Sequence, residues 1–404
     1  MNRTIIFFSI ILFIFSIGLL AQQQTSDGGY IIAGSSNSYS NGMSDFLVYK
    51  LDAAGAKEWR KNFGGVLWDD AVQIQQTTDG GYIVAGITGS YAPAPGSYCD
   101  FLLYKLNAAG NKAWRKNFGG GYCDHAFGVI QTSDGGYLVI GDTSNYVHGT
   151  PNNDNDFLVY KLDAAGNKQW RKNYGGIQTD YGVRAVQTSD GGYMLIGYSE
   201  SYTNGMNDFL VYKVDASGAK LWRKNFGGSA SDYGLFVRQT SDGGYILCGK
   251  TYSYVHFNVP GGTKLGPAAD ILVYRLDASG NKLWRKNYGG NDQDKGFDIR
   301  QTPDGGYVFC GLSSTYTNGE DDMLVYRVDA AGAKLWRKNY GGTFWDDAKY
   351  IAPTSDGGFM IFGNTATYTN GGSDFLVYKI DASGTKLWRK NFGGSNGEWI
   401  NVDD

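Results

Sequence analysis

The sequence predicts an all-β protein, a seven-bladed β-propeller of four-stranded antiparallel blades. Three observations lead to this prediction: a long internal repeat, four strand-like runs in each repeat, and two chain ends that complement each other. The repeat is marked by a Trp-Arg-Lys-Asn unit that occurs seven times, at intervals of 52 to 62 residues. Units that share neighbours build one body rather than a string of separate domains.

Each repeat contains four short runs of strand-forming residues. In the second repeat these runs are residues 71–76, 82–88, 100–106 and 112–118, with Gly-containing turns between them. The chain has 60 Gly and 30 Tyr but only 7 Pro, a balance that fits tight turns between short aromatic strands. Four antiparallel strands in about 50 residues, repeated seven times, are typical of a propeller.

The two ends of the chain are expected to share the first blade. Only residues 22–26 precede the first Asp-Gly-Gly-Tyr turn, which leaves no room for an inner strand there. Residues 398–402 align with the inner strands of the other repeats, so we expect this C-terminal strand to close the ring by pairing into blade 1. The expected units are a signal peptide (1–21) and one propeller (22–404), with blades at 22–65 plus 395–404, 66–120, 121–176, 177–228, 229–290, 291–342 and 343–394.

The N-terminus resembles an export signal. Arg3 precedes an apolar run from Ile5 to Leu20, and the small residue Ala21 follows it. A positive start, a short apolar segment and a small residue at the end are typical of a secretory signal peptide. We expect cleavage near Ala21 and a secreted mature chain, extracellular or periplasmic, without a membrane span; an uncleaved anchor is the alternative.

Charge and cysteine usage limit the possible partners. The formal net charge is −3, and most of the 36 basic residues stand at the same four places in each repeat. Basic residues spread around a ring do not form the pooled patch that nucleic acids require, so no nucleic-acid partner is expected. Cys99 and Cys123 lie in two loops expected on one face, and a disulfide between them is one possibility in an oxidising compartment. Cys248 and Cys310 are expected to be small buried fillers.

The repeat resembles two known families. The pattern Asp-aromatic-x-Val-x-Lys-Leu-Asp-x-x-Gly, then Gly-Gly, Asp and Asp-Gly-Gly-Tyr, runs from Asp156 to Gly192 and recurs in every blade. It resembles the bacterial SBBP-type β-propeller repeat, which implies secretion and a structural or binding role. Asp277 to Trp284 is similar to the Asp-x-x-x-Gly-x-x-x-Trp segment of quinoprotein-like propellers. Catalytic quinoproteins usually have eight blades and often a vicinal Cys pair; this chain has seven and no such pair, so we expect no cofactor.

One acidic residue recurs four positions after each Gly-Gly pair, before the inner strand. These residues are Asp69, Asp124, Asp180, Asp232, Asp294, Asp346 and Glu398. Carboxylates that converge on a channel mouth can bind Ca²⁺, and Asp180, Asp232, Asp294 and Glu398 are candidate ligands. The alternative is that each carboxylate caps its own turn by accepting backbone N–H groups.

A second set of candidates breaks the sevenfold symmetry at the same mouth. Aromatic and acidic residues gather in blades 1, 2, 3 and 7, where flat apolar faces beside polar acceptors suit a sugar ring or a peptide side chain. The candidate ligand-binding residues are Trp68, Asp69, Asp70, Tyr122, Asp124, His125, Trp345, Asp346, Asp347 and Trp399. The alternative is that these rings fill the channel or pack under loops.

The sequence therefore favours a non-catalytic binding or scaffold propeller at the cell surface or in the extracellular space. The ligand would be a glycan, a peptide or a surface protein held at one channel mouth. No known catalytic set is evident, and we name no catalytic residue. Two other hypotheses stay open: a lyase or hydrolase that uses the mouth carboxylates with His125, and a purely structural repeat protein. We also expect a monomer.

Overall fold

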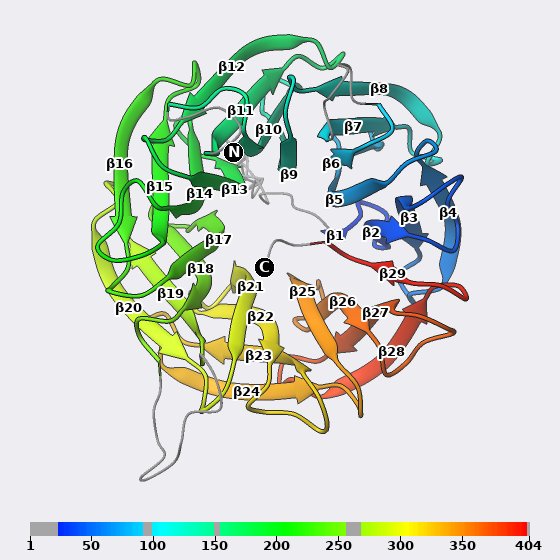
Figure 1. The fold of residues 1–404 in the computed structure, drawn as a ribbon. Helices are drawn as coiled ribbons and strands as arrows, with labels where there is room; N and C mark the ends of the chain where they lie inside the picture. The colour runs from blue at the N-terminus through cyan, green and yellow to red at the C-terminus, as the bar shows by residue number, and fades with distance from the viewer. Residues whose placement is uncertain (1–22, 92–98, 149–153, 256–267, 402–404) are drawn as a thin grey trace, which may run out of the picture.

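The computed structural model describes residues 23–91, 99–148, 154–255 and 268–401, and these residues form a ring of seven β-sheets (Figure 1). The described part of the chain contains strands, turns and bends but no helix. Within it, no helix is long or apolar enough to cross a membrane. The expected signal peptide lies outside the described residues.

Each blade has an inner, a second, a third and an outer strand. The inner strands are β5 (Asp69–Gln76), β9 (Asp124–Gln131), β13 (Asp180–Gln187), β17 (Asp232–Gln239), β21 (Asp294–Gln301) and β25 (Asp346–Pro353), with β1 (Gln23–Gln24) and β29 (Glu398–Trp399) in blade 1. The second strands are β2 (Tyr30–Ser36), β6 (Tyr82–Thr88), β10 (Tyr137–Thr143), β14 (Tyr193–Ser199), β18 (Tyr245–Thr251), β22 (Tyr307–Ser313) and β26 (Phe359–Thr365). The third strands are β3 (Asp45–Leu51), β7 (Asp100–Leu106), β11 (Asp156–Leu162), β15 (Asp208–Val214), β19 (Asp270–Leu276), β23 (Asp322–Val328) and β27 (Asp374–Ile380). The outer strands are β4 (Lys57–Phe63), β8 (Lys112–Phe118), β12 (Lys168–Tyr174), β16 (Lys220–Phe226), β20 (Lys282–Tyr288), β24 (Lys334–Tyr340) and β28 (Lys386–Phe392).

The Asp-Gly-Gly turn between inner and second strands is fixed by its own side chain. In blade 2, Asp79 accepts hydrogen bonds from the hydroxyl of Thr77 and, at 3.0 Å, from the backbone N–H of Gly81. Gly80 takes φ = +78°, a conformation that favours glycine. The ammonium of Lys105, on the third strand, lies 2.9 Å from the carboxylate of Asp79. This ion pair explains why a lysine stands in an otherwise apolar, buried strand.

The repeated tryptophan of the outer strand joins neighbouring blades. The ring of Trp59 in blade 1 lies 5.9 Å from that of Tyr82 in blade 2 and covers the turn glycine Gly110. The same contact closes the ring, because Trp388 of blade 7 covers Gly55 of blade 1. Each blade is therefore joined to the next one by the tryptophan of its outer strand.

The C-terminal strand closes blade 1, but it does so with help from the N-terminus. Strand β29 pairs with β2 at Ser35 and Ser36, as predicted from the sequence. The prediction that no inner strand precedes the first turn is wrong, because β1 pairs with the other end of β2. After Trp399 the chain leaves β2: the backbone N–H of Ile400 donates to the Asn364 side chain of blade 7 at 2.6 Å. The free length of β2 is thus available to β1.

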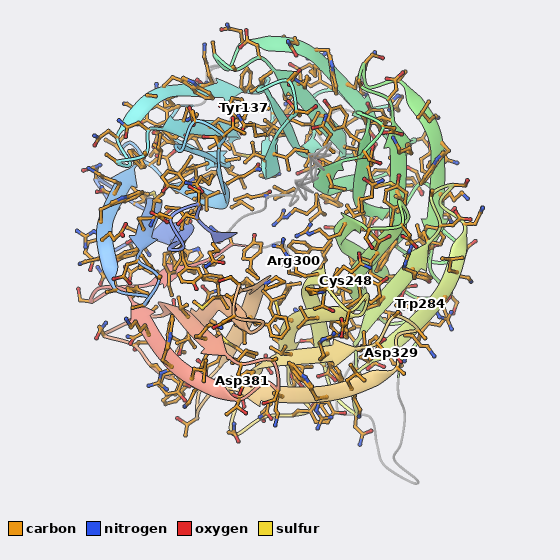
Figure 2. The ribbon with its side chains drawn as sticks, turned by 180° about the vertical axis from the view of Figure 1, so that it is seen from behind. Tyr137, Cys248, Trp284, Arg300, Asp329 and Asp381 are labelled. Atoms are coloured by element: carbon orange, nitrogen blue, oxygen red, sulfur yellow. A yellow bond between two sulfur atoms is a disulfide. The ribbon has the colours of Figure 1, made fainter. Side chains whose placement is uncertain are left out.

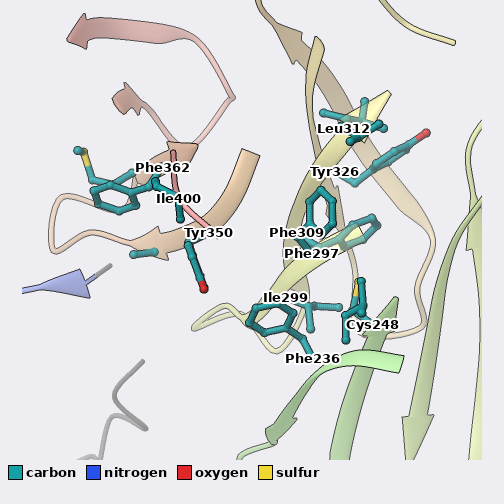
Figure 3. Packing of buried hydrophobic residues seen from close by; sticks show 14 of the residues in the cluster. Phe236, Cys248, Phe297, Ile299, Phe309, Leu312, Tyr326, Tyr350, Phe362 and Ile400 are labelled. Atoms are coloured by element: carbon teal, nitrogen blue, oxygen red, sulfur yellow. The ribbon is translucent and has the colours of Figure 1, made fainter. Parts of the chain in front are cut away.

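Side chains of the inner strands meet across the ring axis. The Arg184 guanidinium of blade 4 donates to the Tyr350 hydroxyl of blade 7 at 3.0 Å, and that hydroxyl donates to the carbonyl of Val72 in blade 2 at 3.3 Å. The rings of Phe236 and Tyr350 lie 5.9 Å apart (Figure 3). Arg300, labelled near the centre of the ring in Figure 2, lies two residues after Asp298 on β21. At this depth the axis is occupied by protein.

Asp298 holds the basic side chains of this axial cluster together. Its carboxylate, fully buried, lies 2.8 Å from the Arg238 guanidinium and 3.0 Å from that of Arg300. Burial lowers the pKa of Arg238 to about 9, and the nearby Arg300 charge adds to this effect. Cys248 and Cys310 are buried free thiols, and burial raises the pKa of both, which suits apolar filling rather than reactivity.

Candidate functional site

The candidate residues lie on one face of the ring, where the inner strands begin; we call it the entry face. The third strands also begin there, so each blade boundary joins the start of a third strand to the start of the next inner strand. At the boundary of blades 1 and 2, the backbone N–H of Asp69 donates to the carbonyl of Ser44 at 2.7 Å. The same bond recurs at all seven boundaries, at 2.6–3.0 Å.

The acidic residue that begins each inner strand caps its own turn. Asp69 accepts a hydrogen bond at 2.7 Å from the backbone N–H of Gly65, and Glu398 accepts the equivalent one from Gly394. All seven of these acidic residues have 0% exposure. Burial raises the pKa of Asp124 and of Asp294 to about 6. The geometry supports the capping role that was the alternative to a Ca²⁺ site.

The cation candidates Asp180, Asp232 and Asp294 have the same environment as the other members of the ring. Each accepts the N–H of the second glycine in its own Gly-Gly pair, at 2.7–2.8 Å. A cation bound by one of these carboxylates would have to compete with that N–H group.

Two tryptophans of the predicted aromatic sector pack against glycines of their own blades. Trp68 covers Gly89, and the ring of Trp399 lies against Gly397. Among the described residues, no ring–ring contact joins Trp68, Trp345 and Trp399. All three are half-buried.

The polar members of that sector differ in how firmly they are held. The Asp347 carboxylate lies 3.2 Å from the Lys349 ammonium and accepts the backbone N–H of Asn364 at 3.1 Å. Asp70 is half-buried, and its neighbour Asp69 caps the turn that precedes the strand. Asp346 accepts the hydroxyl of Thr367 at 2.9 Å. The sector is thus a set of loop-anchored residues.

A different group of aromatic residues does form a continuous surface, and the sequence analysis missed it. The rings of Tyr181 and Tyr198 lie 4.8 Å apart, those of Tyr198 and Tyr233 4.9 Å, and those of Tyr233 and Tyr252 6.3 Å. These four rings, the tyrosine row, cross from blade 4 to blade 5 and are all half-buried. The Lys250 ammonium lies 4.7 Å from the centre of the Tyr233 ring. Tyr181 and Tyr233 occupy the second position of their inner strands, so an alignment of that position could have found them.

His125 occupies the same second position in blade 3 and has an unusual pair of neighbours. Its Nδ1 lies 3.2 Å from the carboxylate of Asp142, directly opposite on β10, and Asp142 is fully buried. Its Nε2 lies 3.3 Å from Sγ of Cys99, which forms a disulfide with Cys123. From the sequence this disulfide was one possibility, and the structure contains it. Tyr122, on the same loop, is 41% exposed and hydrogen-bonded to Asn145 through its backbone.

Cys99, Cys123 and His125 also form the one group of metal-type ligands found among the described residues. Their ligand atoms all lie within 4.8 Å of one another. While the disulfide is intact the two sulfurs are not thiolates, so they are not available as ligands in this form.

The tyrosine that recurs after each second strand serves the fold. The Tyr202 hydroxyl donates to the Gly175 carbonyl of the preceding blade at 2.8 Å, and the Arg223 guanidinium lies 3.4 Å over its ring. Equivalent contacts recur around the ring, for example at Tyr91 with Arg115. A residue with the same two contacts in each blade belongs to the architecture.

Fold and site together define a seven-bladed β-propeller with an asymmetric entry face. No family model matches the chain. The regulatory protein FlaEY of Caulobacter vibrioides is 21% identical over 244 residues, which are 54% of this chain and only 25% of that protein. The chain thus matches about a quarter of the length of this curated relative.

Solved structures share the fold at low sequence identity. The hydrazine synthase of Kuenenia stuttgartiensis has a TM-score of 0.54 and 11% identity, with 92% of this chain and 94% of that chain covered. A puromycin hydrolase S511A mutant has a TM-score of 0.54 and 10% identity, with 96% of this chain and 55% of that chain covered. At these identities the likeness supports the propeller fold alone.

Proposed function

We propose that this protein is an exported binding propeller that holds a carbohydrate on its entry face without converting it. The observation that carries the proposal is the tyrosine row, Tyr181, Tyr198, Tyr233 and Tyr252, with its continuous ring contacts across two blades. Half-buried aromatic rings offer flat apolar surface that is already ordered, so a ligand loses little free energy in ordering it.

Two polar side chains lie beside the row, the buried Lys250 and the half-buried Gln293, and they are the candidates for directional contacts to a sugar. The Lys250 ammonium lies against Tyr233, and the Gln293 amide lies 3.5 Å from the Tyr252 hydroxyl. A small number of polar groups beside apolar rings is the usual composition of a small-ligand site. The predicted sector at Trp68, Trp345 and Trp399 is the competing position on the same face.

Export is the second part of the proposal. It rests on the signal-like N-terminus, on the resemblance to SBBP-type repeats of secreted proteins, and on the Cys99–Cys123 disulfide, which suits an oxidising compartment. Detection of the protein in the medium or periplasm of the source cell, with a mature N-terminus near Gln22, tests this part.

A glycan array tests the binding site. We expect the wild-type protein to bind a defined group of glycans, and Tyr181→Ala and Tyr233→Ala each to weaken binding at least tenfold, because each removes a stacking ring. Trp68→Ala and Trp345→Ala are the matched controls and should bind as wild type. Loss of binding in the Trp variants alone would move the site to the competing sector. Binding by none of the proteins, with EDTA or with added Ca²⁺, would refute the carbohydrate proposal.

A further inference from the structure

The boundary between blades 2 and 3 carries four residues that occur together at no other boundary. Cys99 stands where the other boundaries have Ser44, Asn155, Asn207, Ala269, Asp321 and Ser373. Cys123 stands where they have Trp68, Thr179, Ser231, Gln293, Trp345 and Gly397. The facing pair His125 and Asp142 corresponds to pairs such as Tyr181 with Tyr198 and Tyr233 with Lys250.

The other six boundaries of the ring close without a disulfide. At the six other boundaries the inner strand is fastened to the third strand of the preceding blade by a backbone hydrogen bond of 2.6–2.7 Å, without a covalent link. The same bond is present here, from the N–H of Asp124 to the carbonyl of Cys99 at 3.0 Å. Because six boundaries form without cysteine, the cysteine pair at the boundary of blades 2 and 3 could serve another purpose.

The surroundings of the two sulfurs are those of a reactive disulfide. Cys99 is 1% exposed and its sulfur faces the His125 imidazole at 3.3 Å, whereas Cys123 is half-buried and therefore the more accessible sulfur. The His125 side chain, 32% exposed, is oriented by the fully buried Asp142. A histidine held by a carboxylate beside a sulfur favours the thiolate of that sulfur, which makes it a good leaving group.

We propose that Cys99 and Cys123 form a redox-active disulfide that exchanges with external dithiols, with His125 as the catalytic group at Cys99 and Asp142 as its positioning residue. A dithiol thiolate attacks Sγ of Cys123; a new sulfur–sulfur bond forms, the Cys123–Cys99 bond breaks, and its electron pair goes to Cys99. Protonated His125 stabilises that thiolate or transfers its proton to it. The second thiol of the dithiol then releases Cys123, so the dithiol is oxidised to a cyclic disulfide while the protein gains two electrons and two protons. This activity is independent of the carbohydrate proposal.

The test measures reduction of the native full-length chain by dithiothreitol, in the presence of EDTA so that metal capture by the thiols does not interfere. Thiols are counted over time by alkylation and mass spectrometry, and folding is monitored by near-ultraviolet circular dichroism. We expect the folded wild type to be reduced, and His125→Gln to react at least tenfold more slowly. The matched control is His148→Gln, because His148 also faces a buried aspartate of blade 3, Asp156 at 2.5 Å, but no cysteine. This control should react as wild type.

The role of Asp142 has its own readout. The titratable groups that contact or neighbour the Cys99 sulfur are His125 and Cys123, with Asp142 and Asp124 behind them. Asp142→Asn should shift the pH profile of alkylation of reduced Cys99, whereas a purely structural aspartate would leave the profile unchanged.

The proposal is overturned if the wild-type disulfide is reduced only after unfolding, or if folded His125→Gln reacts at the wild-type rate. If His125→Gln does not fold, alkylation of the reduced wild-type protein is measured against pH instead. We expect Cys99 to react as a thiolate at a pH below the ordinary thiol pKa of about 8.5. Reaction only at a pH above about 8.5 would overturn the proposal.

Discussion

The outer strands and the starts of the inner strands differ in how strictly they repeat. All seven outer strands carry the same Trp-Arg-Lys-Asn unit, and in each blade the tryptophan covers a turn glycine of the next blade. The second residue of the inner strand differs among most blades: Asp70, His125, Tyr181, Tyr233, Lys295, Asp347 and Trp399. Both regions lie in regular strands, so the difference does not come from local structure.

The comparison teaches that the tryptophan is repeated because it makes the same contact between blades seven times. A residue that must fit an equivalent neighbour keeps its identity, whereas the second residue of the inner strand faces a different cross-strand partner in each blade. The axial cluster is an instructive third case, because Arg184, Phe236 and Tyr350 occupy one strand position, differ from each other, and still contact each other. Divergence alone therefore does not identify a ligand site.

The largest expected loss of stability comes from removing a contact that is repeated in every blade. Trp222→Ala should lower the free energy of unfolding by about 3 kcal/mol, because it uncovers Gly280 and a face of the core between blades 4 and 5. Urea unfolding followed by fluorescence measures the effect. Leu221→Ala is the matched control: this neighbour is 57% exposed, and its loss should change stability by less than about 0.5 kcal/mol. Equal effects of the two variants would remove the basis of the comparison.

A smaller effect is expected where divergent residues serve the fold. Tyr350→Phe removes the hydroxyl that bonds Arg184 and the Val72 carbonyl, and should cost about 1–3 kcal/mol because both partners stay buried. Tyr181→Phe, at the half-buried entry face, should leave stability nearly unchanged in the same unfolding assay. A stable Tyr350→Phe protein would mean that the axial cluster is not a structural element.

The fold could be predicted almost completely because its determinants are repeated. The strand pattern, the Trp contact and the closing role of Glu398 and Trp399 each follow from a period visible in the sequence. The inner strand β1 was not predicted, because it has only two residues and lacks the repeated pattern of the other inner strands. The contact between Ile400 and the Asn364 side chain of blade 7 could not be predicted either, since it occurs once in the ring.

The candidate site was harder to predict for the same reason. Tyr198 and Tyr252 lie after the apolar part of their strands, and only the register that places Tyr198 beside Tyr181 brings them into the tyrosine row. Asp142 pairs with His125 through the register of β9 and β10, 17 residues apart in the chain. Sequence reasoning selected Trp68 and Trp345 by residue type, whereas the ring contacts depend on one cross-strand pair and on neighbours in the next blade.

The smallest expected effect separates two sets of repeated aspartates by pH. Asp79 and Asp134, in turns, have a pKa of about 2; their carboxylates are partly buried, which opposes ionisation, but hydrogen bonds and a lysine charge lower the pKa overall. Asp294, at the start of an inner strand, has a pKa of about 6 because burial disfavours its charge. An unfolded aspartate has a pKa of about 3.9. The turn set therefore stabilises the fold above about pH 4 and loses this contribution as the pH falls toward 2. The contribution of Asp294 is full below about pH 4 and is lost as the pH rises through 6.

Urea midpoints between pH 2 and 7 measure both slopes. We expect stability to be highest near pH 4 to 5, and Asp294→Asn to remove a decline of about 1 kcal/mol between pH 5 and 6. Asp79→Asn should instead weaken the decline below pH 4 and leave the upper slope unchanged. If both variants altered the same slope, the two sets would share one environment, and their position in the blade would not determine their charge. The opposite slopes follow because the turn carboxylate faces a lysine, while the strand carboxylate is enclosed by its own loop.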